Sequence, residues 1–134
     1  SYQDKHTILL ALTSNKGAAD FQFYGNDNSL YQEVISKALQ WQNSENLMFV
    51  IGATQPEYFE VIRKLAPYHF FLVPGIGAQG GNLDAVCRYG MNKDIGLIIN
   101  SSRGIIYASR QDDFAKASRN AAQEMQQKMA AYLS

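Results

Sequence analysis

Four unbroken apolar runs along the chain predict four β-strands. The runs are Thr7–Leu12, Leu47–Ile51, Phe70–Val73 and Ile95–Ile99. A strand with one face in water alternates polar and apolar residues, and these runs do not alternate. We therefore expect strands that are buried on both faces, as in a parallel sheet.

Segments with apolar residues at helical spacing lie between and after these runs, and they predict helices. The stretch that starts at Ser29 has the form of a capping box and opens the first helix. The second helix opens at Thr54–Glu57, with Thr54 as its capping residue. A short third helix is expected from about Asn82 to Arg88. A long last helix, from Asp112 to about Leu133, has an apolar face that we expect to pack against the sheet.

The order of these elements predicts an α/β fold built from successive strand–helix units. Right-handed crossovers allow two architectures. The chain forms either a part of a doubly wound sheet or one half of a (β/α)8 TIM barrel. A complete barrel typically takes about 250 residues, and this chain has 134. We therefore expect residues 1–134 to form a single, incomplete domain.

Composition narrows the classes of function. With 46% hydrophobic and 18% charged residues, the chain has the content of a globular domain. Its 12 Lys and Arg residues balance 12 Asp and Glu residues, so no net field attracts nucleic acid or an anionic membrane. No apolar run approaches the roughly 20 residues of a membrane span, and the polar first residues do not have the form of a signal peptide. We expect a cytoplasmic protein without nucleic-acid or membrane partners.

Residue types that often carry chemistry are sparse. Cys87 is the single cysteine, which excludes an internal disulfide, and we expect it to be a plain buried thiol on a helix. His6 and His69 each precede a strand, and we interpret them as polar residues at strand entries. Near Cys87 no His or second Cys has the spacing of metal ligands, so no metal is expected.

The clearest candidate for a binding site is the glycine-rich loop Gly75–Gly81, which directly follows the third apolar run. Glycines let backbone N–H groups approach an anion closely. The fourth run ends in Asn100–Gly104, where Arg103 offers a planar charged fork for phosphate oxygens. The last two loops of a barrel commonly build such a phosphate site. The plainer alternative is a tight turn, with Arg103 paired to a surface carboxylate.

The loop also satisfies the dinucleotide fingerprint Gly75-x-Gly77-x-x-Gly80, which would favour a Rossmann fold. That fold requires an acidic residue about 20 positions further on, at the end of the next strand. Asp94 has this separation but precedes its strand. The strand end carries Asn100–Arg103 instead, and these residues suit a terminal phosphate better than a ribose diol.

Two further side chains belong to the same predicted edge of the sheet. Gln79 offers an amide in the middle of the glycine loop that is able to donate to a phosphate. Ser14 follows the first apolar run, so it would face the same edge. From the residues alone, Ser14 fits a ligand contact and a loop cap equally well.

Four blocks of the sequence carry a family resemblance. They are Thr13–Gln22, Gly52–Glu57, Val73–Gly81 and Asn100–Ala108. Together they resemble orotidine 5'-phosphate decarboxylase, in the longer bacterial type of that family. The resemblance implies a (β/α)8 barrel that converts orotidine 5'-phosphate (OMP) to UMP, in the last step of de novo pyrimidine synthesis. It also implies a homodimer, and a reaction without metal or organic cofactor.

The resemblance assigns substrate-binding roles to residues at the strand ends. Gln79 and Arg103 would hold the 5'-phosphate together with backbone groups of the adjoining loops, and Ser14 would touch the pyrimidine. The full set is Ser14, Pro74, Gly75, Gly77, Gln79, Arg103 and Gly104.

The chain also departs from the family pattern. Lys16 stands where the family usually has proline, and Asn82 replaces a common aspartate. The family's catalytic Lys-x-Asp-x-x-Lys-x-x-x-Asp-like constellation does not occur in the sequence, and we expect it upstream of Ser1. We therefore expect the C-terminal half of the enzyme, with the phosphate site but with no catalytic residue, and inactive by itself.

Two other functions are alternatives. One is another phosphate-binding barrel enzyme, such as an epimerase or a relative of indole-glycerol-phosphate synthase, and the Thr13–Asn15 and Ser101–Gly104 blocks disfavour it. The other is a nucleotide-binding module that is complete as given. A half barrel exposes two sheet edges and the inner face of its strands, so we expect a homo-oligomer.

Overall fold

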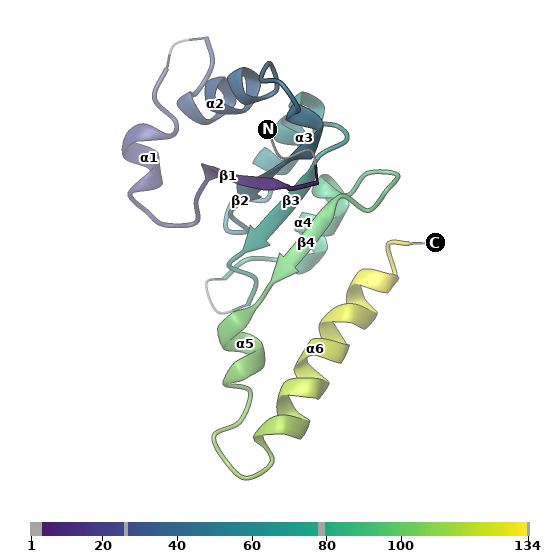
Figure 1. The fold of residues 1–134 in the computed structure, drawn as a ribbon. Coiled ribbons are helices and arrows are strands. Elements are labelled where there is room, and N and C mark those ends of the chain that lie inside the picture. Colours follow the sequence, from purple (N-terminus) through teal and green to yellow (C-terminus); the bar gives the residue numbers. More distant parts are fainter. Residues whose placement is uncertain (1–3, 26, 78–79, 134) are drawn as a thin grey trace.

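The protein forms a four-stranded parallel sheet in which the strands follow one another in chain order (Figure 1). The computed structural model describes residues 4–25, 27–77 and 80–133. The strands are β1 (Thr7–Leu12), β2 (Leu47–Ile51), β3 (Phe70–Pro74) and β4 (Leu97–Asn100). The expected α/β architecture of parallel strand–helix units is confirmed.

The strand bounds agree with the apolar runs to within one residue, except at the start of β4. The run begins at Ile95, but Ile95 and Gly96 have φ angles of 71° and 64°, in the left-handed region. This conformation cannot continue a strand. A turn closed by the hydrogen bond from the Ile95 N–H to the Asn92 carbonyl, at 3.0 Å, precedes β4 instead.

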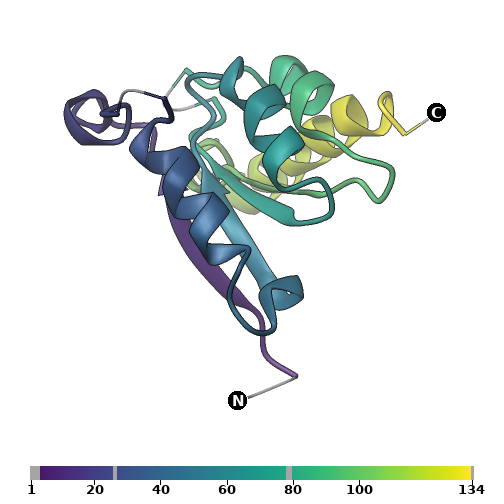
Figure 2. The ribbon, with the colours of Figure 1, turned by 90° about the horizontal axis from the view of Figure 1, so that it is seen from above.

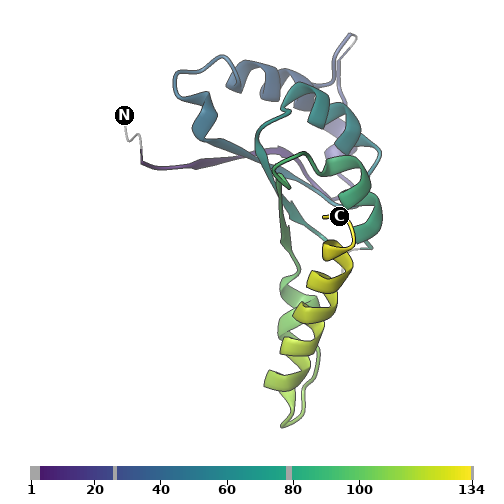
Figure 3. The ribbon, with the colours of Figure 1, turned by 90° about the vertical axis from the view of Figure 1, so that its right-hand side faces the viewer.

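Helices lie between the strands, and others follow β4. They are α1 (Ala18–Phe21), α2 (Leu30–Ala38), the 3-10 helix η1 (Ser44–Asn46), α3 (Tyr58–Leu65), α4 (Leu83–Gly90), α5 (Ser102–Ile106) and α6 (Phe114–Ala130). Figures 2 and 3 show α2, α3 and α4 together on one face of the sheet. The sequence pattern did not predict α1 and α5, which are both short.

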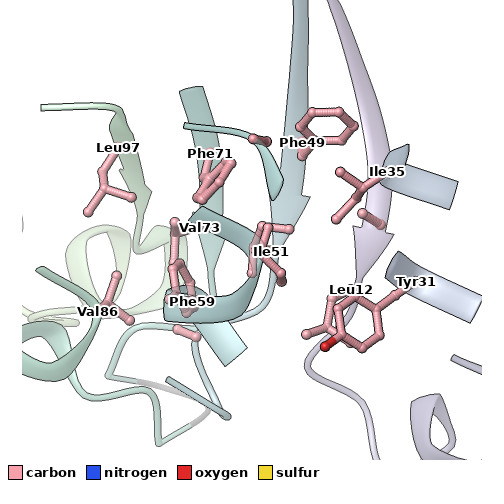
Figure 4. Packing of buried hydrophobic residues seen from close by; sticks show 14 of the residues in the cluster. Leu12, Tyr31, Ile35, Phe49, Ile51, Phe59, Phe71, Val73, Val86 and Leu97 are labelled. Carbon is pink, nitrogen blue, oxygen red and sulfur yellow. The ribbon is translucent and has the colours of Figure 1, made fainter. Parts of the chain in front are cut away.

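The hydrophobic core lies between the sheet and these three helices (Figure 4). Phe49 of β2 and Phe71 of β3 are register partners, and both are fully buried. Ile35, Phe59 and other apolar side chains of the helices pack onto them. Truncating a core phenylalanine to alanine typically costs about 3–5 kcal/mol, so this layer holds the strands in place.

The opposite face of the sheet is open, which corrects the expectation of strands buried on both faces. Leu10 of β1 is 59% exposed and Ile98 of β4 is 41% exposed. Burial alternates along β2 and β3, because every second side chain points away from the helices. The apolar runs are therefore buried on the helix-covered side alone within this chain.

Helix caps agree with the sequence pattern in one case and differ in another. The Ser29 backbone N–H donates to Oε1 of Gln32 at 2.8 Å, as the capping box predicts. Thr54, however, does not cap α3, which has Glu57 at its N-cap position. The Thr54 hydroxyl donates instead to the Ser14 carbonyl at 3.4 Å, so this side chain joins two strand ends.

Helix α6 is shorter and less buried than the sequence pattern predicts. It spans Phe114–Ala130, none of its residues is fully buried, and Phe114 is 60% exposed. Met125 and Met129, further along the helix, pack against the core. The reason is α5, which carries the chain beyond the end of the sheet before α6 runs back beside it (Figure 3).

A half-buried arginine organises the edge of the sheet where the strands begin. The Arg63 guanidinium donates hydrogen bonds of 2.6 to 3.0 Å to several backbone carbonyls. The acceptors belong to Ala66, His69, Gly90 and Gly96. Burial lowers the pKa of Arg63 to about 10, so the group stays charged at neutral pH. None of these hydrogen bonds involves the loops at the carboxyl ends of the strands.

Candidate functional site

A cavity of about 170 Å³ opens between the carboxyl ends of β3 and β4. Because all the strands are parallel, the loops that follow them meet at this edge. The cavity is lined by Pro74, Gly75, Ile76, Asn100, Ser101, Ser102 and Arg103. The structure therefore brings Pro74, Gly75 and Arg103 of the expected phosphate site together.

The glycine loop closes partly on itself. The Gly77 N–H donates to the Gly81 carbonyl at 3.3 Å, and the Gly81 N–H donates to the Gly75 carbonyl at 3.1 Å. Gly75 has a φ angle of 98° and Gly77 one of 72°, which L-residues with side chains rarely adopt. The amide of Gly77 thus serves the loop itself, and Gly77 does not line the cavity.

Gly81 is required for a different reason, which is close packing. A Cβ atom at this position would lie 2.5 Å from the Ala53 Cβ and 2.7 Å from the Gly75 carbonyl oxygen. The loop can therefore lie against the end of β2 only because residue 81 has no side chain. Gln79, which we expected to contact phosphate, lies outside the described residues.

Ser101 ties the two sides of the cavity together. Its side chain is buried, and its hydroxyl donates to the Ile76 carbonyl at 3.3 Å. A Cβ atom at Gly104 would lie 2.7 Å from this hydroxyl oxygen, so Gly104 leaves room for the contact. Gly104 accordingly does not line the cavity, and it contributes by leaving space for the Ser101 hydroxyl. Sequence reasoning missed the role of Ser101, because nothing local indicates a partner 25 residues away.

Arg103 supplies the positive charge of the cavity. It lies in the first turn of α5 and is exposed. Among the residues that the structure describes, no carboxylate lies within ion-pairing distance of its guanidinium. The alternative, in which Arg103 pairs with a surface carboxylate, is therefore not observed in the described part of the chain. A guanidinium in this state is available to an anion in the cavity.

Ser14 lies at the end of β1, two strands away from the cavity lining. Its hydroxyl oxygen is buried and has no hydrogen-bond partner among the described residues. A Cβ atom at Gly52 would overlap this hydroxyl and would lie 2.6 Å from the Ser14 backbone nitrogen. Buried polar atoms are rarely left unpaired in folded proteins. The Ser14 hydroxyl is thus a spare donor at the same edge as Arg103.

Comparison with known proteins decides the family. The model of the orotidine 5'-phosphate decarboxylase / HUMPS family matches residues 1–119. The chain belongs to this family. An orotidine 5'-phosphate decarboxylase of Bacteroides fragilis is 56% identical over 99% of this chain and 49% of its own length. The enzyme of Flavobacterium johnsoniae is also 56% identical, over 97% of this chain and 48% of its own length.

Solved structures of the decarboxylase family agree with this assignment. Leishmania donovani UMP synthase superposes with a TM-score of 0.80 at 39% identity, covering 96% of this chain and 29% of that protein. Leishmania donovani OMP decarboxylase gives a TM-score of 0.77 at 35% identity, covering 96% and 50%. The chain thus spans about half the length of the curated relatives that it matches. The expected TIM-barrel units, and the resemblance to the decarboxylases, are confirmed.

The position of the family's catalytic lysines and aspartates is a separate matter. We expected these residues upstream of Ser1, and Ser1 itself lies outside the described residues. The structure therefore does not test where they are, and their placement before Ser1 stays a prediction.

Other side chains that often carry chemistry lie apart from the cavity between β3 and β4. Cys87 is buried, as expected, and its burial and then the nearby Asp84 carboxylate raise the pKa of its thiol. The His69 Nε2 lies 3.0 Å from the Ser44 carbonyl, at the opposite edge of the sheet. Within residues 4–25, 27–77 and 80–133, no cluster of three or more His, Cys, Asp or Glu side chains is placed to hold a metal. No helix in these ranges has the length and apolarity of a membrane span.

Proposed function

We propose that this chain forms the phosphate-binding and base-binding part of an orotidine 5'-phosphate decarboxylase, a carbon–carbon lyase that releases CO2 from OMP to give UMP. The observation that carries the proposal is the cavity between β3 and β4, where Arg103 has no described carboxylate partner. The family match names the nucleotide. A guanidinium beside a glycine loop suits the 5'-phosphate.

The two contact points suit the two ends of a nucleotide. Arg103 follows β4 and Ser14 follows β1, so β2 and β3 separate them at one edge of the sheet. A nucleoside monophosphate carries its phosphate and its base at opposite ends. With the phosphate at Arg103, the pyrimidine reaches toward β1, where the Ser14 hydroxyl donates to one of its polar atoms.

We further propose that the isolated chain binds nucleotide without decarboxylating it, and that the reaction uses no metal or organic cofactor. In the family, a lysine ammonium protonates the carbon that loses CO2, and aspartates hold that lysine. In the loops at the carboxyl edge, Lys16 is the sole lysine, and it makes no ion pair with a described carboxylate. The chain then contributes binding free energy from contacts far from the reacting carbon. The complementary half uses this free energy to stabilise the transition state at that carbon.

Binding is tested by calorimetry of the chain with UMP. Arg103→Ala is compared with Arg119→Ala, which removes an exposed arginine of α6 away from the cavity. Losing charged hydrogen bonds to phosphate costs about 1.5–3 kcal/mol, so Arg103→Ala should weaken binding roughly 10- to 150-fold. Equal affinities for the two variants would remove Arg103 from the site.

Activity is tested by complementation. The chain is assayed for loss of OMP alone, and again after co-expression with the complementary half of the Bacteroides fragilis relative. We expect turnover only in the second sample, and Arg103→Ala should lower it. Turnover by the highly purified chain alone would contradict the proposed inactivity. No turnover in a correctly folded complex would contradict the proposed function.

We also propose that the chain associates with a second copy of itself. Leu10 on β1 and Ile98 on β4 expose apolar side chains on the open face, and the outer edges of β1 and β4 pair with no other strand in the described structure. Beside β4, an apolar groove of about 340 Å³ runs along α6, with Met125 and Met129 in its wall. A twofold axis parallel to the strands would set β1 of the second copy beside β4, in parallel.

Sedimentation velocity tests this association. We expect a concentration-dependent dimer, which Leu10→Lys weakens because it places a charge on the open face. Lys37→Ala changes an exposed position on α2 and serves as the control. A stable monomer at micromolar concentration would contradict the dimer. The assignment of the chain to the cytoplasm is likewise a proposal, which cell fractionation of the tagged protein tests.

A further inference from the structure

The loop that follows β1 is held by the side chain of Gln22. The Thr13 backbone N–H donates to Gln22 Oε1 at 2.9 Å, and Gln22 Nε2 donates to the Thr13 hydroxyl at 3.0 Å. The Thr13 hydroxyl in turn donates to Asn15 Oδ1 at 2.6 Å. One amide therefore clamps the residue before Ser14 through both its backbone and its side chain.

Ser14 is enclosed on its other side by the loop between β2 and α3. Gly52 lies so close that a Cβ atom there would overlap the Ser14 hydroxyl. The Thr54 hydroxyl donates to the Ser14 carbonyl at 3.4 Å. The backbone of Ser14 is thus fixed from both directions, while its own hydroxyl has no partner in the described structure.

We propose that Gln22 is a positioning residue, which sets the Ser14 hydroxyl for contact with the pyrimidine ring of the nucleotide. This inference rests on the proposed function. Both polar atoms of the Gln22 amide are bonded to Thr13, so Gln22 acts through the loop. Without its amide, the Thr13 N–H loses its acceptor and the segment 13–22 loses its closing contact. The Ser14 hydroxyl then samples several positions and binds the base less well.

The base end can be tested separately from the phosphate end. UMP and ribose 5-phosphate share the phosphate, and only UMP carries the base. The ratio of their dissociation constants, measured by calorimetry on the 134-residue chain, reports the base contact alone. Gln22→Ala should lower the preference for UMP about fivefold, the value of about one hydrogen bond. The affinity for ribose 5-phosphate should stay within about twofold, because the phosphate cavity lies between the ends of β3 and β4, and β2 separates it from the loop after β1.

A double-mutant cycle with Ser14 separates positioning from general stability. Ser14→Ala should lower the preference for UMP by a similar factor, and adding Gln22→Ala should then change it little. Gln22→Glu keeps the acceptor for the Thr13 N–H but loses the donor, so an intermediate loss is expected. Gln127→Ala, at an exposed position of α6, is the matched control and should leave both affinities unchanged.

The outcomes distinguish this inference from the proposed function. If the unmodified chain prefers UMP and Gln22→Ala keeps that preference, the inference is wrong and the proposed function stands. Equal losses of UMP and ribose 5-phosphate affinity in Gln22→Ala, or a full additional loss in the Ser14→Ala background, would also overturn it. If the unmodified chain shows no preference for UMP, the base contact fails and the inference fails with it.

Discussion

The guanidinium carbon of Arg63 lies 3.7 Å from the centre of the Phe71 ring. This cation–π contact joins α3 to the start of β3. The same guanidinium donates to the carbonyl of Gly90 at 2.6 and 2.8 Å and to that of Gly96 at 3.0 Å. Arg63 therefore fixes the end of α4 and the approach to β4, at the edge opposite the proposed site.

Arg63→Met should destabilise the fold by at least about 3 kcal/mol, because several carbonyl oxygens lose their donor at once. Urea unfolding followed by circular dichroism measures this change. Lys64→Met is the control, since Lys64 makes an exposed ion pair with Glu60 at 2.8 Å, and water screens such surface contacts so that they contribute little to stability. Similar losses in the two variants would show that the hydrogen bonds of Arg63 contribute little.

Ser101→Ala should weaken ribose 5-phosphate binding by about 1 kcal/mol, or roughly fivefold. The change removes the hydrogen bond that holds the Ile76 carbonyl to the end of β4, so the glycine loop is no longer fixed beside Arg103. Calorimetry gives the affinity. Ser109→Ala is the control, because the Ser109 hydroxyl bonds to Asp113 away from the cavity. A normal affinity in Ser101→Ala would mean that the loop holds its position without this contact.

Gly81→Ala should both destabilise the protein and impair phosphate binding. The new methyl group would lie 2.5 Å from the Ala53 Cβ, so the loop must move, and such overpacking costs about 1–3 kcal/mol. Gly17→Ala is the comparison, because its nearest contact would be an ordinary 3.5 Å. Thermal unfolding and ribose 5-phosphate titration check the pair. Unchanged binding in Gly81→Ala would show that the cavity tolerates the shift.

The thiol of Cys87 should add to stability at neutral pH and lose this contribution in alkali. Burial and Asp84 raise the pKa of the thiol, so the folded chain holds this proton more tightly than the unfolded chain does. The contribution is complete below the unfolded pKa of about 8.5 and declines as the pH rises through the folded value. The stability difference between the natural chain and Cys87→Ala should therefore shrink above pH ~8.5. A constant difference up to pH ~10 would contradict this prediction.

Local patterns predicted the strands well. The bounds of β1 and β2 match the apolar runs Thr7–Leu12 and Leu47–Ile51, and the capping box at Ser29 is present. These features depend on neighbours within a few residues. The same runs did not reveal that Leu10 and Ile98 would be exposed, because a run records apolarity and not which face is covered.

Contacts between distant residues explain what the sequence could not predict at the site. The Thr54 hydroxyl reaches the Ser14 carbonyl across 40 residues, which overrides its local role as a helix cap. Ser101 reaches Ile76 across 25 residues. The glycine loop and Arg103 were predictable as site candidates because each follows an apolar run. The residues that brace them were not.

The sheet order has a consequence for how the chain acquires its structure. The pairings join Thr7 to Leu47, Met48 to Phe70 and Phe71 to Leu97, so each strand meets the one made just before it. Each pairing spans a single strand–helix unit, and domains generally fold from the N-terminal end during synthesis. The sheet can therefore grow strand by strand on the ribosome, and the phosphate cavity forms only once β4 and Arg103 have emerged.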